Sequence, residues 1–187
     1  LLCFVKRMLA VRLNAIRMQS IEIEMNNQAF SYKKPQKNKK YHFIYGFHPV
    51  IAALRNDKRM KEAIYISHEV YKDEVIKRLV DSHFLPSDIH ILDSKSLQKK
   101  FPDFKPLQGI VLQTQPLADY PLNDFIASLT SQPKATILAL DQVTDPQNIG
   151  AILRTAAAFH ISGLILPKDH CPEENPTIAK TACGGLE

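Results

Sequence analysis

The sequence predicts an α/β protein, in which a small α/β domain precedes the first part of a larger parallel α/β domain. Strand-forming runs alternate with amphipathic helical patterns from residue 43 to residue 113. Residues 135–166 then read as a strand, a helix and a second strand, the unit of parallel sheets. Hydrophobic residues make up an ordinary 45% of the 187-residue chain. No run of 18 apolar residues occurs, so we expect a globular protein without a membrane partner.

The small domain is predicted over residues 41–116. Gly46 and Pro49 mark a turn into a helix, because Val50, Ala53 and Leu54 follow at helical spacing. The later elements are a strand at 63–66, a helix at 71–83 with Val75, Ile76, Leu79 and Val80 inward, a strand at 89–92, a helix at 94–100 capped by Ser94, and a strand at 109–113.

The second domain is predicted over residues 117–187. Pro116, Pro121 and Pro133 mark the junction, with a short helix at 123–129 between them. The continuously apolar run 135–140 is typical of a strand that is covered on both faces. A helix begins near Gln147 or Asn148 and ends before Gly163, and residues 164–166 form the next strand.

The helix that follows residue 147 has two distinct faces. At 100° per residue, Ile149, Ile152, Leu153, Ala156 and His160 share one side. Gly150, Arg154 and Ala158 lie away from it, so Arg154 is expected to point off the core. The two small residues are expected to leave space for an RNA backbone or a second protomer. The polar loop 141–148 follows a strand, where open α/β sheets place their sites.

The positive charge is confined to the beginning of the chain. Of the formal net charge of +5, residues 1–40 carry +7 and residues 41–187 carry −2. The basic leader 1–40 is expected to be disordered and to contact RNA phosphates through Lys33, Lys34, Lys37, Lys39 and Lys40. A solvated leader without a ligand is the alternative, and an organellar transit peptide is a further one. Residues 1–24, which precede Met25, are not expected to belong to the functional protein.

The three cysteines support neither a disulfide framework nor a metal site. Their number is odd, no pair has the C-x-x-C spacing, and no histidine stands at a metal-ligand spacing from them. We therefore expect no bound metal and a reducing, cytoplasmic environment.

Two segments of the second domain resemble the SpoU branch of the SPOUT RNA methyltransferases. The run from Asp141 to Ala156 meets every fixed position of motif 1, Asp-x-Val-x-Asp-Pro-x-Asn-x-Gly-x-x-x-Arg-(Thr/Ser)-Ala. The run Lys180-Thr-Ala-Cys-Gly-Gly-Leu-Glu187 resembles the Lys-x-(Ser/Ala)-x-Gly-x-x-Glu segment that follows in this family.

The small domain resembles the substrate-binding domain of ribosomal-RNA 2′-O-methyltransferases of the same family, a fold shared with ribosomal RNA-binding proteins. The residues that carry this likeness are Ile44-x-Gly46-x-His48-x-Val50-x-x-Ala53-Leu54 and Gln108-Gly109-Ile110. Leu107 departs from the pattern, because the family often has His before that Gln-Gly pair.

The resemblance implies an S-adenosylmethionine-dependent 2′-O-ribose methyltransferase of ribosomal RNA, with a guanosine of 23S rRNA as the expected target. It assigns Arg154 to the 2′-hydroxyl and Asn148 to orienting that arginine or capping the helix. His48 and Glu187 are expected to contact the RNA, and the complete protein is expected to be a homodimer.

The resemblance also predicts that the chain is incomplete. The Gly-x-Glu-x-x-Gly and Ser-Leu-Asn-Val-Ser-Val segments, which build the cofactor-binding trefoil knot of the family, do not occur in it. Cofactor contacts are therefore expected beyond Glu187. Two alternatives remain: an RNA-binding module or inactive remnant whose small domain alone binds structured RNA, and a non-enzymatic ribosome-associated protein. Motif 1 counts against the last, because mere RNA binding does not require Asn148 and Arg154.

Overall fold

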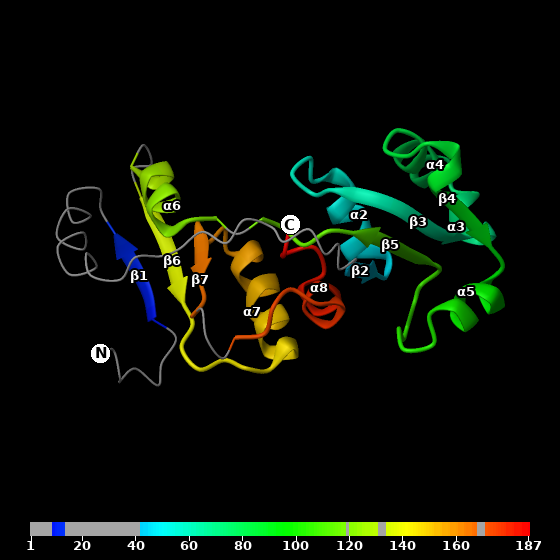
Figure 1. The fold of residues 1–187 in the computed structure, drawn as a ribbon. Helices are drawn as coiled ribbons and strands as arrows, with labels where there is room; N and C mark the ends of the chain where they lie inside the picture. Colours follow the sequence, from blue (N-terminus) through cyan, green and yellow to red (C-terminus); the bar gives the residue numbers. More distant parts are fainter. Residues whose placement is uncertain (1–8, 14–41, 119, 131–133, 168–170) are drawn as a thin grey trace. The chain divides into compact units, whose positions relative to one another are not determined.

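The computed structural model describes residues 9–13, 42–118, 120–130, 134–167 and 171–187, and it confirms the α/β class (Figure 1). These residues divide into two compact units. The larger unit holds 42–117, 145–155 and 172–187, and the smaller holds the remaining described residues. The sequence placed a boundary between residues 116 and 117, and the units separate between Leu117 and Ala118. However, residues 145–155 and 172–187, which the sequence assigned to the second domain, belong to the larger unit together with residues 42–117, the predicted small domain.

The larger unit is built on a four-stranded mixed sheet. Its strands are β2 (His42–Tyr45), β5 (Ile110–Thr114), β3 (Lys61–Ser67) and β4 (Ile89–Leu92), in that spatial order. β3 and β4 are parallel, and β5 is antiparallel to both β2 and β3. The sequence analysis missed β2, because only four residues precede the turn at Gly46 and so short a run shows no periodicity.

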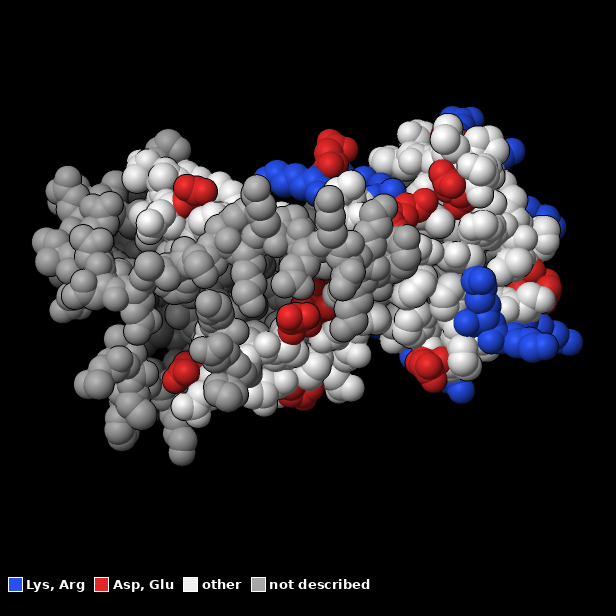
Figure 2. Space-filling view, in the orientation of Figure 1, with Lys and Arg blue, Asp and Glu red and all other residues white. Residues whose placement is uncertain are grey.

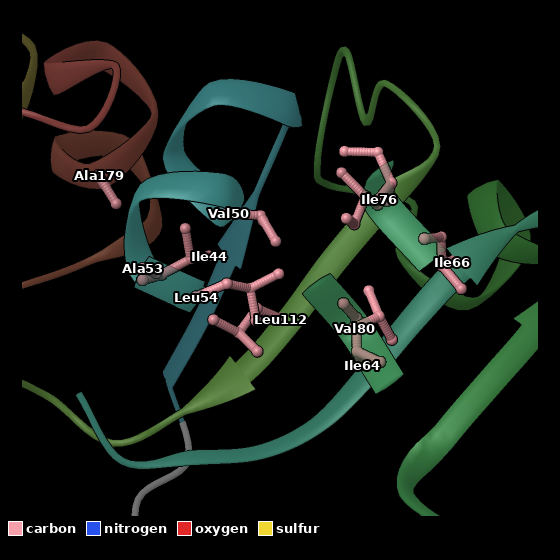
Figure 3. Packing of buried hydrophobic residues seen from close by; sticks show 11 residues of the cluster. Ile44, Val50, Ala53, Leu54, Ile64, Ile66, Ile76, Val80, Leu112 and Ala179 are labelled. Carbon is pink, nitrogen blue, oxygen red and sulfur yellow. The ribbon is translucent and has the colours of Figure 1, made fainter. Parts of the chain in front are cut away.

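One face of this sheet carries the main hydrophobic core. Neighbouring residues of a strand point to opposite faces, so Ile44, Ile64 and Ile66 all face the same side. There they meet α2 (Phe47–Arg55) and α4 (Glu74–Asp81), and Ala179 of α8 (Pro176–Ala182) joins the same cluster (Figure 3). Each fully buried aliphatic side chain contributes about 1.5–3 kcal/mol relative to an exposed one.

The helix predicted at 71–83 is in fact two helices, α3 (His68–Tyr71) and α4. The break occurs because the Asp73 carboxylate accepts hydrogen bonds from the backbone N–H groups of Val75 and Ile76, at 2.9 and 3.0 Å, and so starts a new helix. Ile76 and Val80 are buried one turn apart, whereas Val75 is exposed. The prediction that Val75 points inward is therefore wrong.

The other face of the sheet carries a second, aromatic core. Tyr45 and Val111 pack there against Leu97, Phe101 and Leu107. Leu97 lies on α5 (Ser94–Lys100), whose bounds match the prediction, and the 3-10 helix η2 (Pro86–Asp88) precedes β4. The cap of α5 is Asp93 rather than Ser94, because the Asp93 carboxylate accepts from the Lys95 and Ser96 N–H groups.

The smaller unit contains the two strands predicted in the second domain, whereas most of the helix that connects them along the chain belongs to the larger unit. β6 (Ala135–Ala139) and β7 (Gly163–Ile165) are parallel neighbours joined through α7 (Pro146–Ala158), and α6 (Leu122–Leu129) precedes β6. Gly163 cannot bear a side chain, because a Cβ there would lie 2.2 Å from the Phe125 ring. No helix among the described residues is long and apolar enough to cross a membrane.

β1 (Leu9–Leu13) is the third strand of that sheet and pairs antiparallel with β6. It lies inside the leader 1–40, for which no regular structure was expected. Its backbone extends the sheet at the edge opposite β7. The rest of that leader lies outside the described residues.

Candidate active site

Helix α7 carries both residues expected to act in catalysis. It begins at Pro146, where the missing N–H of proline costs nothing. The Asp145 carboxylate accepts a hydrogen bond of 2.9 Å from the Gln147 N–H, so Asp145 caps the helix. Asn148 therefore lies within the first turn, with its side chain exposed, and the prediction of a capping Asn148 is wrong.

Arg154 lies six residues, about one and two-thirds turns, after Asn148 on the same helix. Its side chain is exposed, as predicted, and none of the described carboxylates forms an ion pair with it. Six residues at 100° each place the two side chains about 120° apart around the axis. Asn148 and Arg154 therefore present two separate polar groups, rather than one side chain that orients the other.

Of the two small residues expected to lie beside Arg154, Gly150 has a packing role and Ala158 is exposed. Gly150 is buried against α8, where a Cβ would lie 2.6 Å from the Thr181 Cβ and 2.9 Å from the Ile178 carbonyl oxygen. The same helices also approach each other at Gly185, which follows α8, because a Cβ there would lie 2.8 Å from the Leu153 carbonyl oxygen of α7. The space at Gly150 is thus filled by α8, and the expectation that it admits RNA or a second protomer is wrong. The two family-like segments contact each other through these glycines.

Lys180 of the second family-like segment contacts Gly46 and Gln108, two of the residues through which the small domain resembles the family. Its ammonium donates hydrogen bonds to the Gln108 side-chain oxygen at 2.7 Å and to the Pro106 carbonyl at 3.2 Å. The same Gln108 oxygen accepts from the Phe47 N–H at 3.1 Å. Gly46, with φ of 90°, leaves room for this arrangement, because its Cβ would lie 2.2 Å from the Lys180 Nζ.

Burial shifts the pKa values of Lys180 and of the nearby Tyr45. The Lys180 ammonium lies 5.3 Å from the centre of the Tyr45 ring. Desolvation lowers the pKa of Lys180, an effect that Cys183 partly opposes, and desolvation also raises the pKa of the Tyr45 hydroxyl. The role of Lys180 that the structure shows is structural, since its hydrogen bonds to Gln108 and to the Pro106 carbonyl connect the second segment to the small domain.

A buried arginine, which the sequence analysis missed, holds the end of the second segment. The Arg59 guanidinium donates two hydrogen bonds to the Glu187 carboxylate, at 2.6 and 3.1 Å. It also pairs with Glu174 at 2.5 Å and donates to the Gln115 carbonyl at 3.0 Å. The Arg59 side chain is 0% exposed, and those of Glu174 and Glu187 are 13% and 7% exposed. Glu187, expected to contact RNA, is therefore committed to an ion pair inside the protein.

The remaining expected RNA contacts divide into two groups. His48 is exposed on the first turn of α2, with its ring 5.6 Å from that of Phe47, so it is accessible to a ligand. Lys33, Lys34, Lys37, Lys39 and Lys40 lie outside the described residues. Leu107, where the family often has His, is buried in the aromatic core. Cys183, in the second family-like segment, is exposed and has a φ of 51°.

On α7, the Arg154 guanidinium and the Asn148 amide are exposed hydrogen-bond donors. The backbone of α7 is packed closely against α8. An exposed guanidinium without a carboxylate partner is suited to an anion such as a phosphate or a developing alkoxide. Buried ion pairs and close-packed glycines give α7 and α8 little freedom to shift. The site is thus a closely packed support for one exposed cationic side chain, Arg154.

Comparisons with known proteins agree with this picture. Residues 135–187 match the model of the SpoU rRNA Methylase family, and residues 43–120 match that of RNA 2′-O ribose methyltransferase substrate binding. The chain is 34% identical over 154 residues to a 23S rRNA (guanosine-2′-O-)-methyltransferase RlmB of Salmonella typhi, covering 77% of this chain and 59% of the relative. It is 35% identical over 146 residues to RlmB of Vibrio parahaemolyticus, covering 78% and 58%.

Among solved structures, an AdoMet-bound rRNA methyltransferase from Sinorhizobium meliloti has a TM-score of 0.56 and 21% identity, covering 78% of this chain and 51% of that one. This likeness supports the fold. The chain spans about three fifths of the length of the curated relatives that it matches. Two matched segments in the order expected for one family, together with the shared fold, lead to one conclusion: the chain belongs to the SpoU rRNA methylase family.

Proposed function

We propose that this protein takes part in methylating a ribose 2′-oxygen of ribosomal RNA, with S-adenosylmethionine as the methyl donor. The names of its relatives support this substrate, since they are 23S rRNA guanosine-2′-O-methyltransferases. The cofactor is supported by the solved structure that carries AdoMet. Within this chain, both family-like segments are present and pack against each other.

The observation that carries the proposal is the state of Arg154. Its guanidinium is exposed and has no described carboxylate partner, on a helix whose backbone is closely packed. An arginine that served only stability would gain most from pairing, as Arg59 does. An unpaired guanidinium on a rigid helix is preorganised for an incoming anion.

Arg154 acts on the 2′-hydroxyl by electrostatics. Because arginine stays protonated in proteins, it does not remove the proton itself. It stabilises the alkoxide that develops on the 2′-oxygen as the proton departs to solvent or to an RNA phosphate. Removing one such donor from a transition state typically lowers kcat by about 10²–10³. Asn148 is assigned a weaker role, as a neutral donor to the RNA near the start of α7.

The residues on α7 fit the RNA half of this reaction rather than the cofactor half. S-adenosylmethionine, when bound, supplies a methyl group on a sulfonium cation. A sulfonium is itself a cation, so the exposed guanidinium of Arg154 repels it. We therefore assign no residue of this chain to cofactor contact.

We assign RNA contacts to His48 and to the lysines at 33, 34, 37, 39 and 40, which would bind phosphates regardless of sequence. Glu187 is assigned to structure instead, because its carboxylate is paired with Arg59. We further propose a homodimer in the cytoplasm. Light scattering on the purified protein tests the dimer, and a monomeric mass would contradict it.

The product of the reaction tests the proposal. The chain is joined after Glu187 to the remaining C-terminal part of the Salmonella typhi relative, and this chimera is incubated with labelled S-adenosylmethionine and 23S rRNA. A methyl group on the 2′-oxygen blocks that oxygen from attacking the adjacent phosphorus, so the labelled linkage should resist alkali. Label on a base, which leaves every linkage alkali-labile, would refute the proposal.

A further inference from the structure

The aromatic core of the larger unit is open to solvent on one side. Phe43 of β2 and Tyr65 of β3 lie on the sheet face opposite the main core, and Phe101 and Phe104 follow α5. The Phe43 ring lies 5.4 Å from that of Phe101 and 6.2 Å from that of Phe104. Together with Lys100, Pro102 and Asp103, these rings line a pocket of about 350 Å³.

The rings of this pocket are held in place by their neighbours. Phe104 stacks on Tyr45 with an interplanar angle of 3° and a centroid distance of 4.7 Å. The Tyr65 hydroxyl lies 3.3 Å from the Gln113 side-chain oxygen, and its ring stacks on His90. Phe43, Tyr65 and Phe104 nevertheless remain half-buried rather than buried, so they present apolar surface to a ligand. The volume is at the lower end of the range of about 300–1,000 Å³ for small-ligand pockets.

The chain segment that supplies most of the pocket lining is basic. Residues 94–106 contain four lysines and one acidic residue, Asp103. All four lysines, at 95, 99, 100 and 105, are exposed, and none forms an ion pair with a described carboxylate. Lys100 lies over the Tyr65 ring, with its Nζ 4.9 Å from the ring centre. Figure 2 shows lysine and arginine side chains gathered over the region of α5.

We propose that this pocket binds one unpaired nucleotide of the RNA substrate, with the base against Phe43 and Tyr65 and its phosphate on Lys100. The combination of half-buried aromatic rings with unpaired cations around them is how proteins bind single-stranded nucleic acid. A base inside a duplex cannot enter, because both its faces are stacked. The target would therefore be a loop or bulge. The inference rests on the proposed function only in that the ligand is RNA.

Direct binding tests this proposal without cofactor or methyl transfer, so its failure is separate from failure of the proposed function. The 187-residue chain is titrated into a labelled unpaired RNA hexamer or a labelled, fully paired RNA hairpin, and binding is followed by the fluorescence anisotropy of the RNA. Phe43→Leu keeps apolar volume but removes the aromatic face, and Lys100→Gln removes the cation from an exposed position. Lys72→Gln, at an exposed lysine that follows α3, is the matched control.

We expect Phe43→Leu to weaken hexamer binding by about 5- to 140-fold, the loss measured for one stacked base. Lys100→Gln should flatten the slope of log affinity against log salt by about 0.7, which is one phosphate on a single strand. Lys72→Gln should change neither quantity, and circular dichroism checks that each variant is folded. Hexamer binding unchanged in both pocket variants, or equal binding of the paired hairpin, would overturn the proposal. In that case the aromatic surface serves another partner.

Discussion

Replacing Arg59 with alanine should be among the most destabilising single changes in the larger unit. The substitution removes four hydrogen bonds and leaves the carboxylates of Glu174 and Glu187 without their cation. Both side chains are at most 13% exposed, so water cannot fully replace the guanidinium. Breaking a buried ion pair by removing one partner costs about 3–5 kcal/mol.

Urea unfolding, followed by circular dichroism, measures this cost. For an m-value of about 2 kcal/mol per M, the midpoint should fall by about 1.5–2.5 M. Arg55→Ala, at the exposed end of α2, is the control and should stay within about 0.5 kcal/mol. The double variant Arg59→Ala with Glu187→Gln should recover part of the loss, because one of the orphaned charges is gone. A loss below about 1 kcal/mol in Arg59→Ala would show that water replaces the guanidinium, and the reasoning would fail.

Three further perturbations test the packing, the capping and the charges of the larger unit. Gly150→Ala should destabilise the chain by about 1–3 kcal/mol in thermal unfolding, because its Cβ would press on the Ile178 carbonyl; a gain in stability, as for an exposed helix glycine, would contradict that packing. Asn175→Ala should cost about 1 kcal/mol, because its side chain accepts from two N–H groups of α8, and an unchanged urea midpoint would remove that role. Hydrogen bonds from Ser96 and then Lys95 lower the pKa of Asp93 below its unfolded value of 3.8. The ionised carboxylate therefore stabilises the fold at pH values above 3.8, and this contribution is lost as the pH falls through the lower folded pKa. Acid unfolding curves of wild type and Asp93→Asn should differ in that pH window, and identical curves would contradict the shift.

The sequence predicted those elements whose signals are local. Helix α5 and strand β4 have the predicted bounds, since each is framed by polar residues and shows its own periodicity. The exposure of Arg154 also followed from helical spacing alone. The neighbours of Gly150 did not, because the same spacing describes a face that is free and one that another helix covers.

Arg59 shows why the rest of the site was not predictable. Its partner Glu187 is 128 residues away along the chain, and nothing in the residues around Arg59 distinguishes it from an exposed arginine. The only available signal was that Glu187 matches a fixed position of a family segment, and this was interpreted as a substrate contact. Long-range ion pairs depend on tertiary packing, which a pattern of local periods does not contain.

The methyl-transfer rate of the chimera with Arg154 replaced tests the central claim most directly. Arg154→Ala should lower kcat by about 10²–10³, while the affinities for S-adenosylmethionine and RNA remain within about twofold. Arg154→Lys should lose nearly as much, since a point charge on a flexible stem does not reproduce the planar guanidinium. Arg55→Ala should keep the full rate. If Arg154→Ala instead retained more than about half of the wild-type kcat, Arg154 would be an ordinary surface arginine and the proposed role would be wrong.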